Sequence, residues 1–222
     1  MKTVLSLLVV LFLLTVGNVT AQSLQKLDTL QLSAPNLDKG VPFMQALKNR
    51  KSTRELSDKK LSLQHLSELL WAANGVNRED GKRTAPVAMN KQVIDIYVVL
   101  QEGVYLYEPV KNQLVPIAEG DFRKQAGMQD FVFFAPVNLV YVLDLDKYKD
   151  LPPFAANLPN EEKIKWACIA AGCQAQNVNL YCASEGLGAT VRGLIDQKIF
   201  GEVIKLRPDQ IIILAQTVGY PK

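Results

Sequence analysis

Residues 163–186 read KIKWACIAAGCQAQNVNLYCASEG, and this long stretch decides the fold. Asn160, followed by Glu161 and Glu162, makes a good helix start just before it, because acidic side chains stabilise the first turn of a helix. The stretch is rich in Ala, Gly and Cys, whose small side chains let another helix approach closely. We therefore expect one long helix that packs closely against its neighbours.

Two shorter helices are expected upstream of this stretch. Pro42 opens the first, which reads FMQALKNR. Ser62 is suited to cap the second, LQHLSELLWAAN, in which Leu63, Leu66 and other apolar residues recur at helical spacing. Gly75 follows in the C′ position that glycine favours at helix ends. The second helix should therefore have one buried face.

Strand patterns lie between these helices. Residues 94–100, 104–107 and 113–117 are strand candidates, and Glu102-Gly103 supplies the first turn, which predicts an antiparallel meander. A short helix is expected over Asp121 to Ala126.

Two more apolar runs complete the expected sheet. Residues 137–145 are rich in β-branched side chains and suit a central strand, and residues 210–218 form a closing strand. Helices and strands alternate irregularly, and the hairpins argue against a purely parallel sheet. The fold class is therefore α+β.

The N-terminus has the pattern of a cleavable secretion signal. Lys2 precedes the apolar run VLSLLVVLFLLTV, and Val19 and Ala21 are small residues placed for cleavage before Gln22. The run is shorter than the roughly 20 residues that span a bilayer, although signals and retained anchors grade into one another. We expect a signal peptide over 1–21, a lead-in segment over 22–41 and one domain over 42–222. The mature protein would be secreted or periplasmic, with no stable membrane anchor.

Charge and cysteine content exclude several classes of function. The net charge of +3 is small and its cations are dispersed, so nucleic acid is not an expected partner. Cys168, Cys173 and Cys182 fall within the expected long helix and fit no zinc spacing, and His65 is the only histidine. We expect no metal site, and we interpret the cysteines as small buried apolar residues.

Residues 49–54, Asn-Arg-Lys-Ser-Thr-Arg, place three cations and a hydroxyl just after the first helix. If this segment is extended, Arg50, Ser52 and Arg54 project to one side and could present two guanidinium groups and a hydroxyl to a phosphate. A solvated charged loop is the alternative interpretation.

The order of segments resembles the FMN-dependent nitroreductase family, particularly the branch of the SagB-type dehydrogenases. The matching phrases are Arg50-Lys51-Ser52-Thr53-Arg54-Glu55-Leu56, Leu69-Leu70-Trp71-Ala72-Ala73-Asn74-Gly75, Pro86-Val87-Ala88-Met89-Asn90, Glu185-Gly186-Leu187-Gly188-Ala189 with Gly193, and Gly219-Tyr220-Pro221. The resemblance implies a nitroreductase-like fold with a mostly antiparallel central sheet flanked by helices. It also implies a homodimer with FMN at the subunit interface, to which the long helix contributes.

The resemblance assigns three groups of cofactor-binding residues. The first would hold the FMN phosphate, ribityl chain and pyrimidine edge: Arg50, Lys51, Ser52 and Arg54. The second would line the flavin from the other subunit: Pro86, Val87, Ala88 and Asn90. The third would place backbone N–H groups near the reactive flavin nitrogen: Val191, Arg192 and Gly193. Val87 stands where the family usually has Ser, which leaves contact there to the backbone.

The implied function is an exported FMN-dependent oxidoreductase, which reduces nitroaromatic, quinone-like or other small electron-poor substrates. The alternatives are an azoline dehydrogenase like the SagB-type relatives, and a non-catalytic dimeric ligand-binding protein. No side chain stands out as a catalytic acid or base, but an Arg192 cation could stabilise reduced flavin or bind an anionic substrate. NAD(P)H is scarce outside the cytoplasm, so the sequence does not indicate the electron donor.

Overall fold

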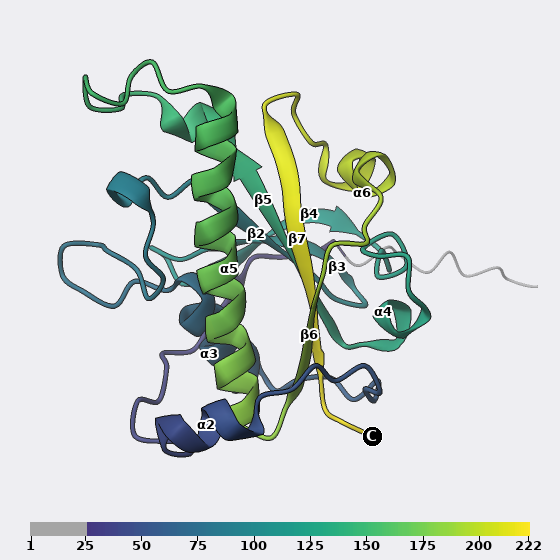
Figure 1. Ribbon diagram of the computed structural model, residues 1–222. Coiled ribbons are helices and arrows are strands. Elements are labelled where there is room, and N and C mark those ends of the chain that lie inside the picture. The colour runs from purple at the N-terminus through teal and green to yellow at the C-terminus, as the bar shows by residue number, and fades with distance from the viewer. Residues whose placement is uncertain (1–25) are drawn as a thin grey trace, which may run out of the picture.

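The computed structural model describes residues 26–222 and has the expected α+β architecture (Figure 1). Its seven-stranded sheet has the order β1-β4-β3-β2-β5-β7-β6, and all neighbouring strands pair antiparallel. The strands are β1 Leu30–Gln31, β2 Ile94–Val99, β3 Gly103–Glu108, β4 Gln113–Glu119, β5 Val137–Asp144, β6 Gly188–Arg192 and β7 Gln210–Gly219.

Helices cover both faces of this sheet. They are α2 Phe43–Asn49, α3 Leu63–Asn74, α4 Asp130–Phe134, α5 Asn160–Ser184 and α6 Gln197–Ile204, with short 3-10 turns at Ala88–Asn90 and Leu145–Tyr148. The long helix α5 crosses one face together with α3, and α2 lies against one end of it (Figure 1). The helices α4 and α6 lie on the opposite face (Figure 1).

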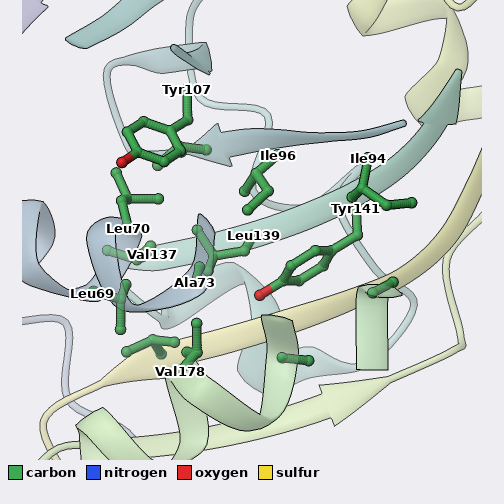
Figure 2. Close-up of a cluster of buried hydrophobic side chains, with 14 of the residues drawn as sticks. Leu69, Leu70, Ala73, Ile94, Ile96, Tyr107, Val137, Leu139, Tyr141 and Val178 are labelled. Atoms are coloured by element: carbon green, nitrogen blue, oxygen red, sulfur yellow. The ribbon is translucent and has the colours of Figure 1, made fainter. Parts of the chain in front are cut away.

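The strand β5 is the centre of the sheet, and all eight of its residues are buried. It pairs with β2 on one side and β7 on the other. Its side chains point alternately to the two faces, so Leu139 and Tyr141 pack beneath α3 and α5 (Figure 2). On the other face, Val140 and Val142 pack with Phe200 of α6. The predicted central strand is confirmed.

The meander and three of the predicted helices, α2, α3 and α5, are confirmed as well. The Ser62 hydroxyl accepts a hydrogen bond from the His65 backbone N–H at 3.1 Å, which caps α3 as expected. The strands β2, β3 and β4 form the antiparallel meander. The long helix α5 begins at Asn160 and buries Ala167, Ala170, Ala171 and other small residues. Its tight contact with α3 follows from those small side chains.

The structure corrects two local expectations. Residues 121–126 form turns instead of a helix, because the Asp121 carboxylate accepts hydrogen bonds from the Arg123 backbone and side chain and closes the chain locally. The helix of this region begins later, at Asp130. Gly75 has an extended conformation rather than a left-handed one. A side chain there would overlap the Trp71 indole, so close approach explains this glycine.

Two further findings change the sequence-based interpretation. Cys182 is buried as expected, but Cys173 is only half-buried and Cys168 is exposed on α5, so the expectation of burial is confirmed for Cys182 alone. The lead-in segment pairs with the sheet through β1. The proposed signal peptide lies outside the described residues.

Candidate functional site

The segment after α2 is held in place by backbone hydrogen bonds on both sides. The Thr53 N–H donates to the Ala189 carbonyl oxygen at 3.0 Å, and the Thr190 hydroxyl donates to the Thr53 carbonyl oxygen at 2.6 Å. On the other side, the Ser57 N–H donates to the Tyr220 carbonyl oxygen at 2.8 Å. The segment therefore runs extended between β6 and the C-terminal residues.

This extended backbone gives the segment two different sides. Lys51 and Thr53 line a cavity of about 210 Å³ that is closed by the C-terminal part of α5 and the start of β6. Ser52 and Arg54 do not line this cavity and are exposed. The predicted alternation of side chains along residues 50–54 is thus present.

The cations of this segment are free of carboxylate partners. Lys51 and Arg54 are exposed and Arg50 is half-buried, and none of the three forms an ion pair within residues 26–222. Because the backbone is fixed and the charges are unpaired, the segment presents a concentrated positive surface beside the cavity. Such a surface favours an anionic group such as a phosphate.

The structure places the 86–90 segment in the loop between α3 and β2. Its residues Met89 and Asn90 have left-handed backbone conformations, with φ of 52° and 54°. Val87 packs against the core beneath α3 and α5. None of these residues lines the cavity beside Lys51. Their assignment to the other subunit's half of the site stays a prediction.

The third predicted group lies at the end of β6. Val191 is 40% exposed, whereas Arg192 is 5% exposed and points to the opposite face of the sheet. Val191 therefore lies on the strand that holds Thr53, since Thr53 and Thr190 are hydrogen bonded, and Gly193 directly follows this strand. Two of the three predicted groups therefore share one edge of the sheet.

The Arg192 guanidinium is buried, and each of its three nitrogens donates to an oxygen inside the protein. It donates to the Thr217 hydroxyl at 2.7 Å, to the Ala126 carbonyl oxygen at 2.8 Å and to the Asn138 side-chain oxygen at 3.0 Å. Burial lowers the pKa of Arg192 to about 10. The expectation that this cation acts directly on flavin or on an anionic substrate is therefore wrong, and its backbone N–H role stays a prediction.

Sequence reasoning missed a larger cavity next to this strand. It has a volume of about 770 Å³, and α4 and α6 contribute Phe133, Phe134 and Ile199 to its lining. Met128, another lining residue, donates its N–H to the Leu194 carbonyl oxygen at 3.4 Å, directly after the predicted group 191–193. The aromatic sequence at residues 131–134 is the signal that could have indicated this apolar cavity.

Residues 26–222 contain neither a candidate metal site nor a candidate membrane-spanning helix. No group of three or more His, Cys, Asp or Glu side chains in this range is arranged to hold a metal ion. Within the same range, no helix combines the length and the apolar character needed to cross a membrane.

Comparisons with known proteins agree with this geometry. The family model described as "Nitroreductase family" matches residues 47–220. A crystal structure of a candidate nitroreductase from Ralstonia eutropha JMP134 is 42% identical to this chain, with a TM-score of 0.78. The match covers 87% of this chain and 90% of that one.

Two more distant relatives match over similar lengths. A candidate nitroreductase of Methanocaldococcus jannaschii is 26% identical over 197 residues, which cover 84% of this chain and 96% of that protein. A candidate NAD(P)H:FMN oxidoreductase from Staphylococcus epidermidis shares the fold at 16% identity and a TM-score of 0.63, over 85% of this chain and 91% of that one. With its family match, its sheet and its site segments, this chain belongs to the nitroreductase family.

Proposed function

We propose that this protein is an FMN-dependent oxidoreductase that reduces small electron-poor molecules, such as nitroaromatic or quinone-like compounds. The observation that carries the proposal is the set of unpaired cations at Arg50, Lys51 and Arg54 on a fixed extended backbone. The family membership supports oxidoreductase activity, and the S. epidermidis relative is described as an NAD(P)H:FMN oxidoreductase.

The donor set of the segment fits the phosphate end of FMN. Arg50 and Arg54 offer planar guanidinium groups and Ser52 offers a hydroxyl, a combination that suits a phosphate dianion. Lys51 adds a point charge on the cavity side of the same segment. When bound, FMN supplies the two-electron chemistry, while the protein provides binding, orientation and electrostatics. The contacts of Thr53 with β6 fix the backbone that carries these donors.

The cavity at α4 and α6 is our candidate for the substrate side of the site. Phe133 and Phe134 stack edge to face, with ring centroids 5.2 Å apart, and both line the cavity. Aromatic walls favour flat apolar molecules. The cavity adjoins Leu194, so a flat substrate bound there would lie next to residues 191–193.

We also propose that the protein is a homodimer whose flavin sites need residues 86–90 of a second copy. Large apolar side chains are exposed on two helices: Phe43 of α2 is 65% exposed, Met44 of α2 73% and Ile169 of α5 60%. Exposed apolar surface of this kind on α2 and α5 favours association. Ile169→Asp should convert the dimer into monomers, as measured by analytical ultracentrifugation, while Lys198→Asp on α6, on the opposite face of the sheet, should not.

The exported location is also a proposal, based on the signal pattern of residues 1–21. N-terminal sequencing of protein recovered outside the cytoplasm should begin at Gln22. A chain that starts at Met1 and stays in the cytoplasm would contradict the proposal.

The absorption spectrum of freshly purified protein tests the cofactor. A bound flavin absorbs at about 450 nm, and the loaded, chemically reduced protein should lose its electrons to p-nitrobenzoate or to menadione. A colourless protein that also refuses added FMN would leave the non-catalytic ligand-binding alternative. Oxidation of an azoline peptide without turnover of either small acceptor would favour the SagB-type alternative.

A further inference from the structure

A further cavity lies at the C-terminal end of α3. It has a volume of about 440 Å³, within the range of small-molecule sites. Asn74, Arg83 and Tyr107 line its inner part, and the turn between β3 and β4 forms its rim. None of residues 50–54, 86–90 or 191–193 lines it.

Three buried polar atoms of this cavity lack a hydrogen-bond partner among residues 26–222. They are the Tyr107 hydroxyl, the Asn74 Oδ1 and the Arg83 Nε. Tyr107 is 4% exposed and Asn74 is 3% exposed, and Tyr107 lies at one edge of the core cluster (Figure 2). An unmade buried hydrogen bond costs about 1–3 kcal/mol, so native proteins rarely leave three together. All three belong to residues that line the cavity, so a small shift of its wall would bring them within hydrogen-bond distance of a polar ligand.

The charges around the cavity favour an anion. Asp95 is paired with Lys147 at 2.5 Å, and Glu108 is paired with Lys111 at 3.5 Å. Arg83 forms no ion pair within the described chain, and its Nη1 donates only to the Asn74 backbone carbonyl oxygen at 3.1 Å. Burial lowers the pKa of the Arg83 guanidinium, as expected for a cation without a carboxylate beside it. The pairing of the other charges leaves one cation for a ligand.

The hydrogen-bonding character of the three atoms indicates which chemical groups the ligand must carry. The Arg83 Nε–H and the Tyr107 hydroxyl can both donate to a carboxylate. The Asn74 Oδ1 can only accept, so it requires a donor on the same ligand. We propose that this cavity binds a small carboxylate with an adjacent N–H group, of the kind found in an N-acylated amino acid. This site is independent of the proposed flavin site.

The experiment uses the full mature chain, loaded with FMN where it accepts FMN, and N-acetylglycine as the probe. We expect binding with a Kd on the order of 1 mM by chemical-shift titration, given the small size of the probe. N-acetylglycinamide lacks the carboxylate and N-acetylsarcosine lacks the N–H, so both should bind about tenfold more weakly. Equal binding of the three compounds, or no binding of N-acetylglycine, would overturn the proposal.

Two variants locate the binding site. Tyr107→Phe removes only an unpartnered hydroxyl, so it should fold normally and weaken N-acetylglycine binding about five- to tenfold. Arg83→Leu should weaken it more than tenfold, and unfolding curves show whether this variant is intact. Flavin content should equal that of the wild type in both variants, which separates this site from the cofactor site. Unchanged N-acetylglycine affinity in Tyr107→Phe would place the probe elsewhere and contradict the assignment.

Discussion

The cations of residues 50–54 and the cation of Arg192 lie on neighbouring segments of the chain but have different surroundings. Arg50, Lys51 and Arg54 sit on a fixed backbone with no carboxylate partner within the described chain. Arg192 is buried and donates to three neutral oxygens. An exposed charge without a protein partner can hold a ligand, whereas a buried charge that is hydrogen bonded to two strands and a loop holds the protein together. The first group should therefore determine cofactor affinity and the second should determine stability.

Replacement of Arg192 should give the largest effect. Arg192→Leu removes hydrogen bonds that join β6 to β7, to β5 and to the Ala126 carbonyl, so the free energy of unfolding should fall by about 3 kcal/mol. Urea denaturation measures this change. FMN affinity of the folded fraction should stay within about twofold of the wild type. A stable variant with lost FMN affinity would reverse the roles of the two regions.

Removing the charges of Arg50 and Lys51 should have the opposite effect, with FMN affinity lost and stability kept. Arg50→Gln combined with Lys51→Gln removes two charged donors, so the Kd for FMN should rise about 10- to 100-fold. Stability without FMN should change by less than about 0.5 kcal/mol, because neither side chain has a protein partner in the described structure. Fluorescence titration gives the Kd, and Lys48→Gln on α2 serves as the matched control. An unchanged Kd would remove the segment from the cofactor site.

A third change tests whether the position of the segment matters. An added Cβ at Gly188 would lie 2.8 Å from the Thr53 Cβ and 2.7 Å from the Leu56 Cδ2. Gly188→Ala should push residues 53–56 away from β6, which would lower stability by about 1–2 kcal/mol and weaken FMN binding about threefold. Gly172→Ala is the control, because a side chain there meets no atom within 4 Å. Equal behaviour of the two variants would show that the close contact is unimportant.

A change in salt concentration should have the smallest effect, and it should change FMN affinity but not the stability contribution of Arg192. Raising ionic strength from about 0.05 M to about 0.5 M should weaken FMN binding a few-fold, because the exposed charges are screened. The stability difference between wild type and Arg192→Leu should not change, because buried groups are screened much less. A salt-insensitive Kd would mean that the three cations contribute little to binding.

Strong local patterns made most of the fold predictable. The apolar run of β5 and the capped helices α3 and α5 appear where the sequence placed them. The strands β1 and β6 were not predicted, because β1 has two residues and β6 begins with a glycine and ends with a buried arginine. Their pairing depends on distant segments, which local patterns do not describe.

The same limit applies to the candidate site. The order of motifs indicated residues 50–54 and 191–193, and the structure places these segments on one edge of the sheet. The side to which Arg192 points depends on β6 being a strand, so its burial could not be inferred without that strand. The burial of Cys182 and the exposure of Cys168 likewise depend on which face of α5 meets the sheet.

One side-by-side measurement tests the division between these two regions most directly. FMN titration and urea denaturation are performed on the wild type, on Arg192→Leu and on the Arg50→Gln, Lys51→Gln double variant. We predict that the double variant loses FMN affinity at unchanged stability, and that Arg192→Leu loses stability at unchanged affinity. The same loss of both quantities in both variants, or the reverse assignment, would contradict the account.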